Sequence, residues 1–176
     1  MPSASGKTWS DVVLDTLKAN DVRLAVYVPD KILIPVIDGV RNDPFFTAVG
    51  ATREEEGVGI CAGAWMGGMR SILMMQTSGF GNTPNALASL AVAYQIPVVL
   101  LISERGALGE FNTGQVWSSR VVAPVCAALG IPHHVIERLE DVEFILDRSI
   151  KQAVATQSPA ALVLSPLLTG GKVFAA

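Results

Sequence analysis

Short apolar segments typical of strands alternate with segments of helical periodicity along nearly all of this 176-residue chain. Strands separated by helices are joined by crossovers and therefore lie parallel in one sheet. The expected strands are residues 23–29, 45–49, 71–75, 98–103, 133–137 and 160–166, and the expected helices are residues 11–20, 31–42, 52–69, 86–95, 121–130 and 140–157. The sequence predicts an α/β fold: a doubly wound parallel sheet of about six strands with helices on both faces. We expect Ser10 to cap the first helix.

Composition limits the classes of partner. Half of the residues are hydrophobic and 16% are charged, against roughly 25% in an average chain. The net charge of −3 and the lack of a basic cluster argue against nucleic acid as a partner. No segment has the run of about 20 apolar residues that a membrane span needs, and the start of the chain lacks the apolar core of a signal peptide. We expect Cys61 and Cys126 to be buried and reduced, in one cytoplasmic domain formed by residues 1–176.

Three consecutive acids precede a glycine-rich run in residues 52–69. The macrodipole explains why Glu54, Glu55 and Glu56 stand at the start of a helix. It does not explain the glycines behind them, because each glycine destabilises a helix interior by roughly 1 kcal/mol relative to alanine. Close approach by another backbone or by a flat ligand would offset that cost.

One of the three glutamates shares a face with those glycines. Counting by four along the helix aligns Glu55 with Gly59, Gly63 and Gly67. We expect Glu55 to be kept from water at the head of this face, with a raised pKa that suits it to share a proton. The other two glutamates should face water or pair with basic groups such as Arg53.

Function in doubly wound sheets gathers where the strands end. Four loops qualify: residues 28–31, 50–56, 76–84 and 103–114. The third contains Ser-Gly-Phe-Gly-Asn at residues 78–82, which suits close approach of a ligand and leaves phosphate binding by backbone amides open. It lacks the third glycine of a dinucleotide fingerprint. His133 and His134 have no partner at metal-ligand spacing, so no metal site is expected on this chain.

Three segments carry a resemblance to a known family. Residues 52–65 (TREEEGVGICAGAW), 74–106 (MMQTSGFGNTPNALASLAVAYQIPVVLLISERG) and 130–134 (GIPHH) resemble the thiamine-diphosphate-dependent 2-oxo acid decarboxylases. Within that family the segments are most similar to the alpha subunits of sulfopyruvate decarboxylases and to the related phosphonopyruvate decarboxylases. The resemblance implies a pyrimidine-binding domain with a parallel α/β fold.

The resemblance also implies roles for individual residues. In the family, a glutamate two residues before a glycine hydrogen-bonds the N1′ nitrogen of the aminopyrimidine ring, and Glu55 occupies that position. A proton shared there activates the cofactor. The other predicted cofactor contacts are Gly59, Ser78, Gly79, Gly81 and Asn82. The predicted substrate contacts are Asp30, Lys31 and Arg105, of which the two cations would hold a distal sulfonate or phosphonate, although both could instead be solvated surface residues.

A family motif is missing from the 176 residues. The family holds the diphosphate and Mg²⁺ with a Gly-Asp-Gly motif followed by an asparagine. The resemblance therefore implies a split enzyme, active only as a hetero-oligomer with a separate diphosphate-binding beta subunit that also holds the metal. The expected reaction converts 3-sulfopyruvate to sulfoacetaldehyde and CO₂.

Two departures from the family leave alternatives open. Glu104 stands where relatives usually have His or Trp, and residues 28–33 (VPDKIL) are closer to the phosphonopyruvate enzymes. A phosphonopyruvate decarboxylase-type subunit, a carboligase subunit and a non-catalytic α/β binding module therefore remain alternatives.

Overall fold

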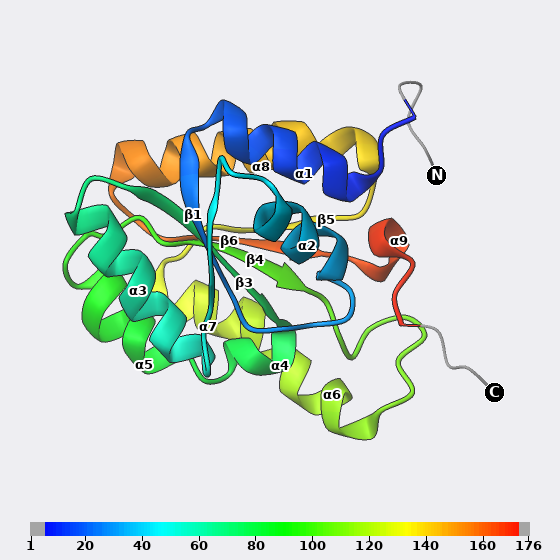
Figure 1. Ribbon diagram of the computed structural model, residues 1–176. Helices are drawn as coiled ribbons and strands as arrows, with labels where there is room; N and C mark the ends of the chain where they lie inside the picture. The colour runs from blue at the N-terminus through cyan, green and yellow to red at the C-terminus, as the bar shows by residue number, and fades with distance from the viewer. Residues whose placement is uncertain (1–5, 173–176) are drawn as a thin grey trace.

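The computed structural model describes residues 6–172, which form a sheet of six strands (Figure 1). The strand order is β2-β1-β3-β4-β6-β5, and every neighbouring pair is parallel. The strands are β1 (Val22–Tyr27), β2 (Thr47–Gly50), β3 (Arg70–Gln76), β4 (Val99–Ser103), β5 (His133–Ile136) and β6 (Ala160–Leu164). The predicted parallel sheet is confirmed.

Helices cover both faces of the sheet (Figure 1). One face carries α1 (Trp9–Ala19), α2 (Ile34–Asn42) and α8 (Leu139–Thr156). The other carries α3 (Glu54–Met66), α4 (Thr77–Phe80), α5 (Pro84–Ala86), the π-helix η1 (Leu87–Val92) and α7 (Val122–Leu129). The remaining helical segments are α6 (Thr113–Ser118), the 3-10 turn η2 (Ser119–Val121) and α9 (Pro166–Thr169).

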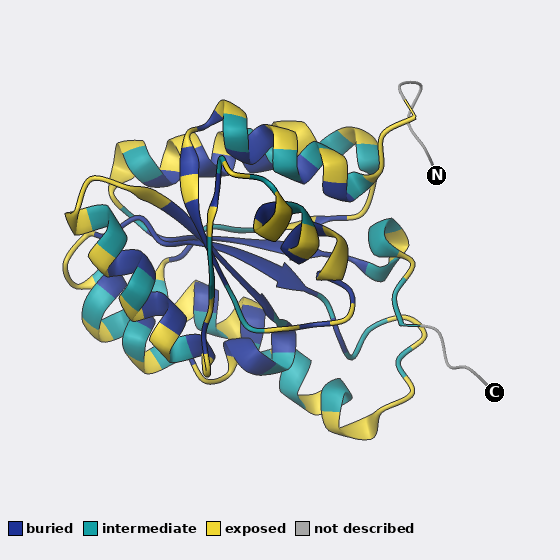
Figure 2. Ribbon diagram, viewed as in Figure 1, coloured by how far each residue is buried: buried dark blue, intermediate teal, exposed yellow. Residues whose placement is uncertain are grey.

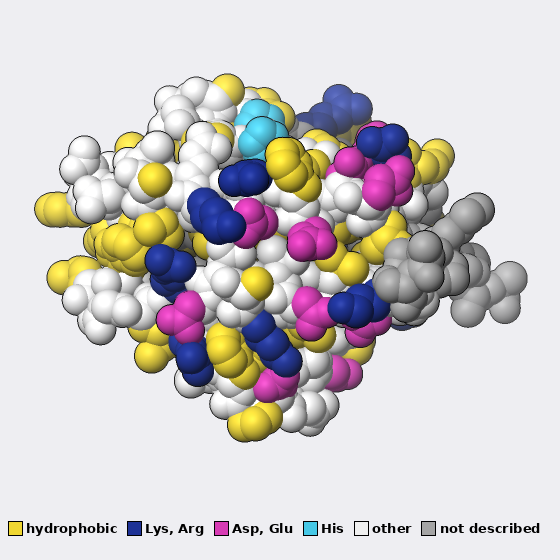
Figure 3. Space-filling model, turned by 90° about the horizontal axis from the view of Figure 1, so that it is seen from above, with side chains coloured by type: hydrophobic (Ala, Val, Ile, Leu, Met, Phe, Trp, Pro, Cys, Tyr) yellow, Lys and Arg dark blue, Asp and Glu magenta, His cyan; other side chains and the backbone are white. Residues whose placement is uncertain are grey.

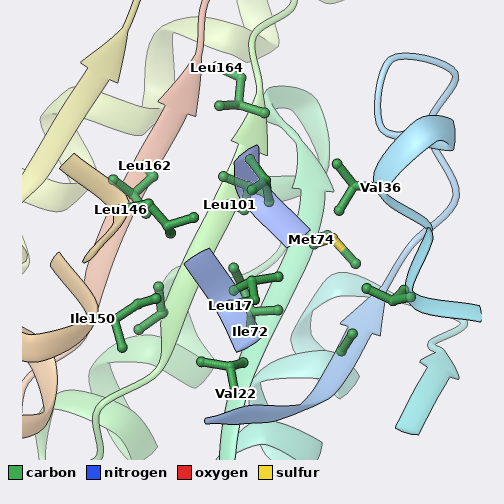
Figure 4. Close-up of a cluster of buried hydrophobic side chains, with 14 of the residues drawn as sticks. Leu17, Val22, Val36, Ile72, Met74, Leu101, Leu146, Ile150, Leu162 and Leu164 are labelled. Carbon is green, nitrogen blue, oxygen red and sulfur yellow. The ribbon is translucent and has the colours of Figure 1, made fainter. Parts of the chain in front are cut away.

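The sheet separates two hydrophobic cores, and its central strands β1, β3, β4 and β6 are largely buried, whereas the edge strands β2 and β5 are mostly not (Figure 2). In the first core, Leu17 of α1 and Leu146 of α8 pack over Ile72 and Leu101 (Figure 4). The second core lies beneath α3 and includes Val58. All residues of β4 and β6 are buried, as expected for parallel strands covered on both sides.

Local differences from the predicted elements have identifiable causes. Thr8, not Ser10, caps α1, because Thr8 and Asp11 form a reciprocal capping box through the Thr8 hydroxyl and the Asp11 carboxylate. The segment 76–84, predicted as a loop, contains the short helix α4, and α6 begins at the end of the predicted loop 103–114 and extends beyond it to Ser118.

The face formed by α1 and α8 is a solvated surface. Basic and acidic side chains are interspersed on it (Figure 3), and several are paired, as in Lys151 with Asp147. None of the helices in residues 6–172 combines the length and apolar character needed to cross a membrane. Cys61 and Cys126 are buried and carry free thiols, as predicted.

Candidate functional site

The carboxyl ends of β2, β1, β3 and β4 lie side by side, because these strands are consecutive in the sheet. The loops that follow them are the four loops in which the sequence predicts function. Side chains tie these loops together: the Ser103 hydroxyl donates to Asp30 Oδ1 at 2.8 Å, and the Arg105 amide donates to Thr77 Oγ1 at 3.0 Å. The edge is therefore a connected layer of loops.

The three glutamates at the start of α3 occupy three different environments. Glu54 is buried, with 7% of its surface exposed. The Glu55 side chain is 37% exposed. Glu56 is exposed, and its Oε2 accepts a hydrogen bond from the Thr52 amide at 2.7 Å, which satisfies a backbone group at the helix start. Because successive helical residues point about 100° apart, the three neighbouring glutamates point in different directions and make different contacts.

One carboxylate oxygen of Glu55 accepts a hydrogen bond and the other does not. Its Oε1 accepts a hydrogen bond from Arg53 Nε at 2.6 Å. Its Oε2 is shielded from solvent and has no hydrogen-bond partner among residues 6–172. The hydrogen bond from Arg53 lowers the pKa of Glu55 from its usual value and outweighs desolvation. The predictions that Glu55 is kept from water and has a raised pKa are therefore wrong for this chain. Arg53, named as one partner for the flanking glutamates, pairs with Glu55 instead, whereas Glu56 faces water as one of the two expected alternatives.

Glu54 also differs from expectation, since it does not face water. Its Oε2 accepts a hydrogen bond from Asn82 Nδ2 at 2.9 Å. Its Oε1 lies against Gly79, where a Cβ atom would collide with it. The carboxylate is therefore enclosed between α3 and the turn after β3.

The glycines of α3 divide between its two sides. A Cβ atom on Gly57 would collide with the buried Leu73 side chain, so packing explains that glycine. Gly59 and Gly63 are exposed, and a Cβ atom on either would meet nothing within 4 Å in the described chain. Gly67 caps the helix end. Packing among residues 6–172 therefore does not explain why Gly59 and Gly63 are glycines.

The turn at residues 78–82 is closed on itself. The amides of residues 81–83 donate to the carbonyls of residues 78–80 at 3.3, 2.9 and 2.9 Å. Those amides are consequently engaged, and the phosphate cradle considered from the sequence is not formed by them. Ser78 is partly exposed and Gly81 is exposed. Contact between this turn and a cofactor stays a prediction.

Asp30 and Lys31, both predicted to contact substrate, are placed very differently. Asp30 is 6% exposed, and besides the Ser103 hydroxyl its Oδ1 accepts the Ile32 amide at 3.0 Å. Its Oδ2 lies 3.6 Å from Lys172 Nζ. Lys31 is exposed to solvent. Asp30 therefore organises the loop, whereas Lys31 lies free to meet an anion at the edge.

Arg105, the other predicted substrate cation, is engaged inside the chain. Its Nε and Nη2 donate to the two carboxylate oxygens of Glu110 at 2.8 Å each, and both side chains are almost fully buried. Glu110 also accepts the amides of Gly106 and Asn112. The hydrogen bond from Arg105 is the main reason that the pKa of Glu110 falls to about 2. This geometry disfavours contact between Arg105 and a substrate anion.

Sequence reasoning did not identify Glu110 as the partner. A signal was present, because Glu110 is the only acid between Arg105 and residue 114. A buried charge needs a partner, but which side chains are buried was not visible in the sequence.

Glu104 points from the end of β4 toward the segment after β6. Burial raises the pKa of Glu104, and a hydrogen bond with Ser165 opposes that effect. Residues 6–172 contain no group of three or more His, Cys, Asp or Glu side chains arranged to hold a metal ion. A hollow of about 1380 Å³ lies between α1, the start of α8 and α9, and none of the predicted site residues lines it.

Residues 7–113 match the protein family described as "Thiamine pyrophosphate enzyme, N-terminal TPP binding domain". The sulfopyruvate decarboxylase subunit alpha of Methanothermobacter thermautotrophicus is 37% identical over 150 residues, covering 83% of this chain and 91% of that protein. The subunit of the same name from Methanococcus maripaludis is 30% identical over 158 residues, covering 90% of this chain and 95% of that protein.

Two further comparisons involve longer proteins. A sulfopyruvate decarboxylase from Methanosarcina acetivorans is 32% identical over 157 residues, which are 88% of this chain but 39% of that protein. The structure of 2-oxoglutarate:ferredoxin oxidoreductase from Magnetococcus marinus aligns with a TM-score of 0.72 at 13% identity, covering 93% of this chain and 29% of the other. At that identity the likeness concerns the fold alone.

Proposed function

The chain belongs to the thiamine pyrophosphate enzymes, and from that membership we propose that it is the alpha subunit of a split, thiamine-diphosphate-dependent 2-oxo acid decarboxylase. In this proposal residues 1–176 are a single pyrimidine-binding domain, and Glu55 is the catalytic residue that binds the cofactor ring. The proposed reaction releases CO₂ from 3-sulfopyruvate and leaves sulfoacetaldehyde.

The unengaged oxygen of Glu55 carries this proposal. A shielded carboxylate oxygen without a hydrogen-bond partner is costly unless a donor reaches it. A protonated ring nitrogen would supply that donor. The adjoining exposed glycines Gly59 and Gly63 leave the backbone accessible beside it, so the residues present fit an aminopyrimidine ring bound edge-on to Glu55.

The cofactor and the chain divide the chemistry between them. When bound, thiamine diphosphate supplies the carbon nucleophile that adds to the 2-oxo carbon and the electron sink for loss of CO₂. Glu55 holds a proton at the ring nitrogen and thereby sets the tautomer of the ring. The Arg53 pair keeps Glu55 ionised in the chain by itself, so the proton would be shared once the ring competes with Arg53 for the carboxylate.

Two observations support a separate partner subunit. The relatives named subunit alpha are matched over 91% and 95% of their length, whereas the Methanosarcina enzyme extends well beyond the matched 39%. The 176 residues contain no Gly-Asp-Gly motif. In this proposal the partner holds the diphosphate and Mg²⁺, and the hetero-oligomer acts in the cytoplasm, where the free thiols of Cys61 and Cys126 stay reduced.

The identity of the 2-oxo acid depends on the cation that meets its distal anion. Lys31 is the exposed cation of the two predicted ones, and we assign it to the distal anion of the substrate. A phosphonate would satisfy the same cation. A phosphonopyruvate decarboxylase from Streptomyces viridochromogenes is 40% identical over 88 residues, half of this chain.

Co-expression with a Gly-Asp-Gly partner subunit tests the proposal. The purified complex should decarboxylate 3-sulfopyruvate faster than 3-phosphonopyruvate, and this chain alone should bind thiamine diphosphate weakly and catalyse nothing. Calorimetry that found tight, Mg²⁺-dependent binding by the chain alone would rule out the split arrangement. A complex that binds the cofactor but decarboxylates neither acid would rule out the reaction.

A further inference from the structure

We propose that Glu54 is a positioning residue that locks the first turn of α3 to the turn after β3, so that Glu55 and residues 78–82 form one rigid cofactor platform. The inference rests on the proposed function, because it concerns the geometry of the same site. It goes beyond that function because it assigns Glu54 and its partner Asn82 a positioning role that is distinct from contact with the cofactor.

The hydrogen bond of Glu54 and its close approach to Gly79 both involve the turn after β3. Asn82 Nδ2 donates to Glu54 Oε2 at 2.9 Å, and Glu54 Oε1 occupies the space above Gly79 that a Cβ atom would need. Glu54 is 7% exposed, although it lies in the first turn of its helix. The side chain therefore joins two loops that are separated by β3 and meet only at this edge of the sheet.

A purely structural role does not account for a carboxylate at this position. Burying a charged group costs free energy that its hydrogen bonds only partly offset, and an apolar side chain of similar volume commonly serves stability equally well. What the carboxylate adds is direction, since a hydrogen bond fixes the angle between two elements. Because Glu55 is the next residue of the helix, fixing Glu54 also fixes the direction in which Glu55 points.

This arrangement reassigns two residues of the turn. The Asn82 side chain donates to Glu54, so its predicted contact with the cofactor is replaced by a contact within the chain. A Cβ atom at Gly79 would displace the Glu54 carboxylate from its present position, so the glycine leaves room for the contact. Ser78 and Gly81 remain the residues of the turn that can face the cofactor.

A reciprocal exchange of donor and acceptor tests the lock in the assembled complex. Asn82→Asp places two carboxylates against each other, and we expect the Kd for thiamine diphosphate to rise about 10-fold or more, the scale of a lost hydrogen bond to a charged group. Adding Glu54→Gln restores the bond with the donor on Gln and the acceptor on Asp. The double variant should recover a Kd within about threefold of wild type.

Three controls separate positioning from general damage. Glu56→Gln makes the same chemical change two residues away and should leave the Kd within about twofold. Asn82→Ala removes the donor without adding a charge and should weaken binding in the same direction, which covers failure of the Asp variant to fold. The KM for 3-sulfopyruvate should stay unchanged in all folded variants, because the lock acts on the cofactor.

The outcomes are distinct. Failure of the double variant to recover, or an unchanged Kd in both Asn82 variants, overturns the positioning role. An equal loss of cofactor and 2-oxo acid affinity also overturns it, as that result indicates general loosening. The predicted Kd pattern in a complex that decarboxylates neither acid refutes the proposed activity while leaving the lock in place. A wild-type complex that binds no thiamine diphosphate refutes the proposed function itself, before any variant is compared.

Discussion

The two sides of α3 carry the same residue types and have opposite surroundings. Glu54 and Gly57 face the core, where each is explained by a contact within the chain, to Asn82 and to Leu73 respectively. Glu55 and Gly63 lie on the open side, where a glutamate oxygen lacks a hydrogen-bond partner in the described chain and a Cβ atom would meet nothing. Residues that the fold explains and residues that only function explains therefore alternate along one helix.

Leucine substitutions on the two sides of α3 should have the largest effects, on stability for Gly57→Leu and on assembly or cofactor binding for Gly63→Leu. Gly57→Leu should destabilise the chain by about 1–3 kcal/mol or more, because the new side chain overpacks the buried Leu73. Gly63→Leu should leave the chain as stable as wild type or more so, because leucine favours a helix over glycine, yet the variant should fail to assemble with the partner or to bind cofactor. Thermal unfolding and size-exclusion chromatography measure the two effects. Normal assembly and activity of Gly63→Leu would remove the argument for close approach.

Neutralising the open-side carboxylate should produce the next largest effect. Glu55→Gln keeps the shape of the side chain but cannot hold the proton on the ring nitrogen, so turnover should fall about 10²-fold or more. Glu56→Gln should lose far less, because that carboxylate bonds the Thr52 amide. Steady-state kinetics of the assembled complexes compares them. Equal losses in the two variants would contradict the assignment of roles by helix face.

Acidification should weaken the loop after β4 by protonating Glu110. The pKa of Glu110 lies near 2 in the folded chain and near 4.5 as a free side chain, so its contribution is complete above pH 4.5 and disappears as the pH falls toward 2. The contribution should be on the order of 3 kcal/mol. Wild-type stability should therefore fall across this window more steeply than that of Glu110→Gln. Chemical denaturation at a series of pH values measures both proteins. If the free energies of unfolding of wild type and Glu110→Gln depend on pH in the same way, the Arg105–Glu110 pair does not stabilise the loop.

The smallest expected effect concerns the exposed ion pair at the start of α3. Arg53→Ala removes the hydrogen bond that lowers the pKa of Glu55, so the carboxyl should titrate closer to its ordinary pKa in the isolated chain. Turnover of the complex should change by less than about threefold, because surface pairs contribute little. Carbon-13 NMR of the side-chain carboxyl follows the titration. An unchanged titration would mean that Arg53 does not contact Glu55 in solution.

Much of the fold was predictable because parallel strands leave a strong pattern. Segments such as residues 98–102 are apolar throughout, since helices cover both sides of the sheet. The alternation of strands and helices along the chain also predicted that four loops lie together at one edge of the sheet. The cap of α1 was misplaced by two residues, because Thr8 and Ser10 are both good capping residues and only the reciprocal bond with Asp11 decides between them.

The site was only partly predictable, because periodicity gives a helix face but not what that face meets. Counting by four correctly placed Gly59 and Gly63 on one face of the helix, and the structure shows that both are exposed. It could not show that Glu54 reaches Asn82, 28 positions away in the sequence, or that Arg53 bends back to Glu55. The partner of Arg105 lies only five residues along the chain and was missed because the sequence does not show that both side chains are buried.

The exchange rate of the C2 proton of bound thiamine diphosphate tests the role of Glu55 most directly, because it reports activation of the cofactor without any substrate. It should be measured by hydrogen–deuterium exchange in assembled complexes saturated with cofactor, for wild type, Glu55→Gln and Glu56→Gln. The account predicts exchange slowed about 10²-fold or more in Glu55→Gln and near-wild-type exchange in Glu56→Gln. Exchange in Glu55→Gln as fast as in wild type would contradict the central claim that this carboxylate activates the cofactor.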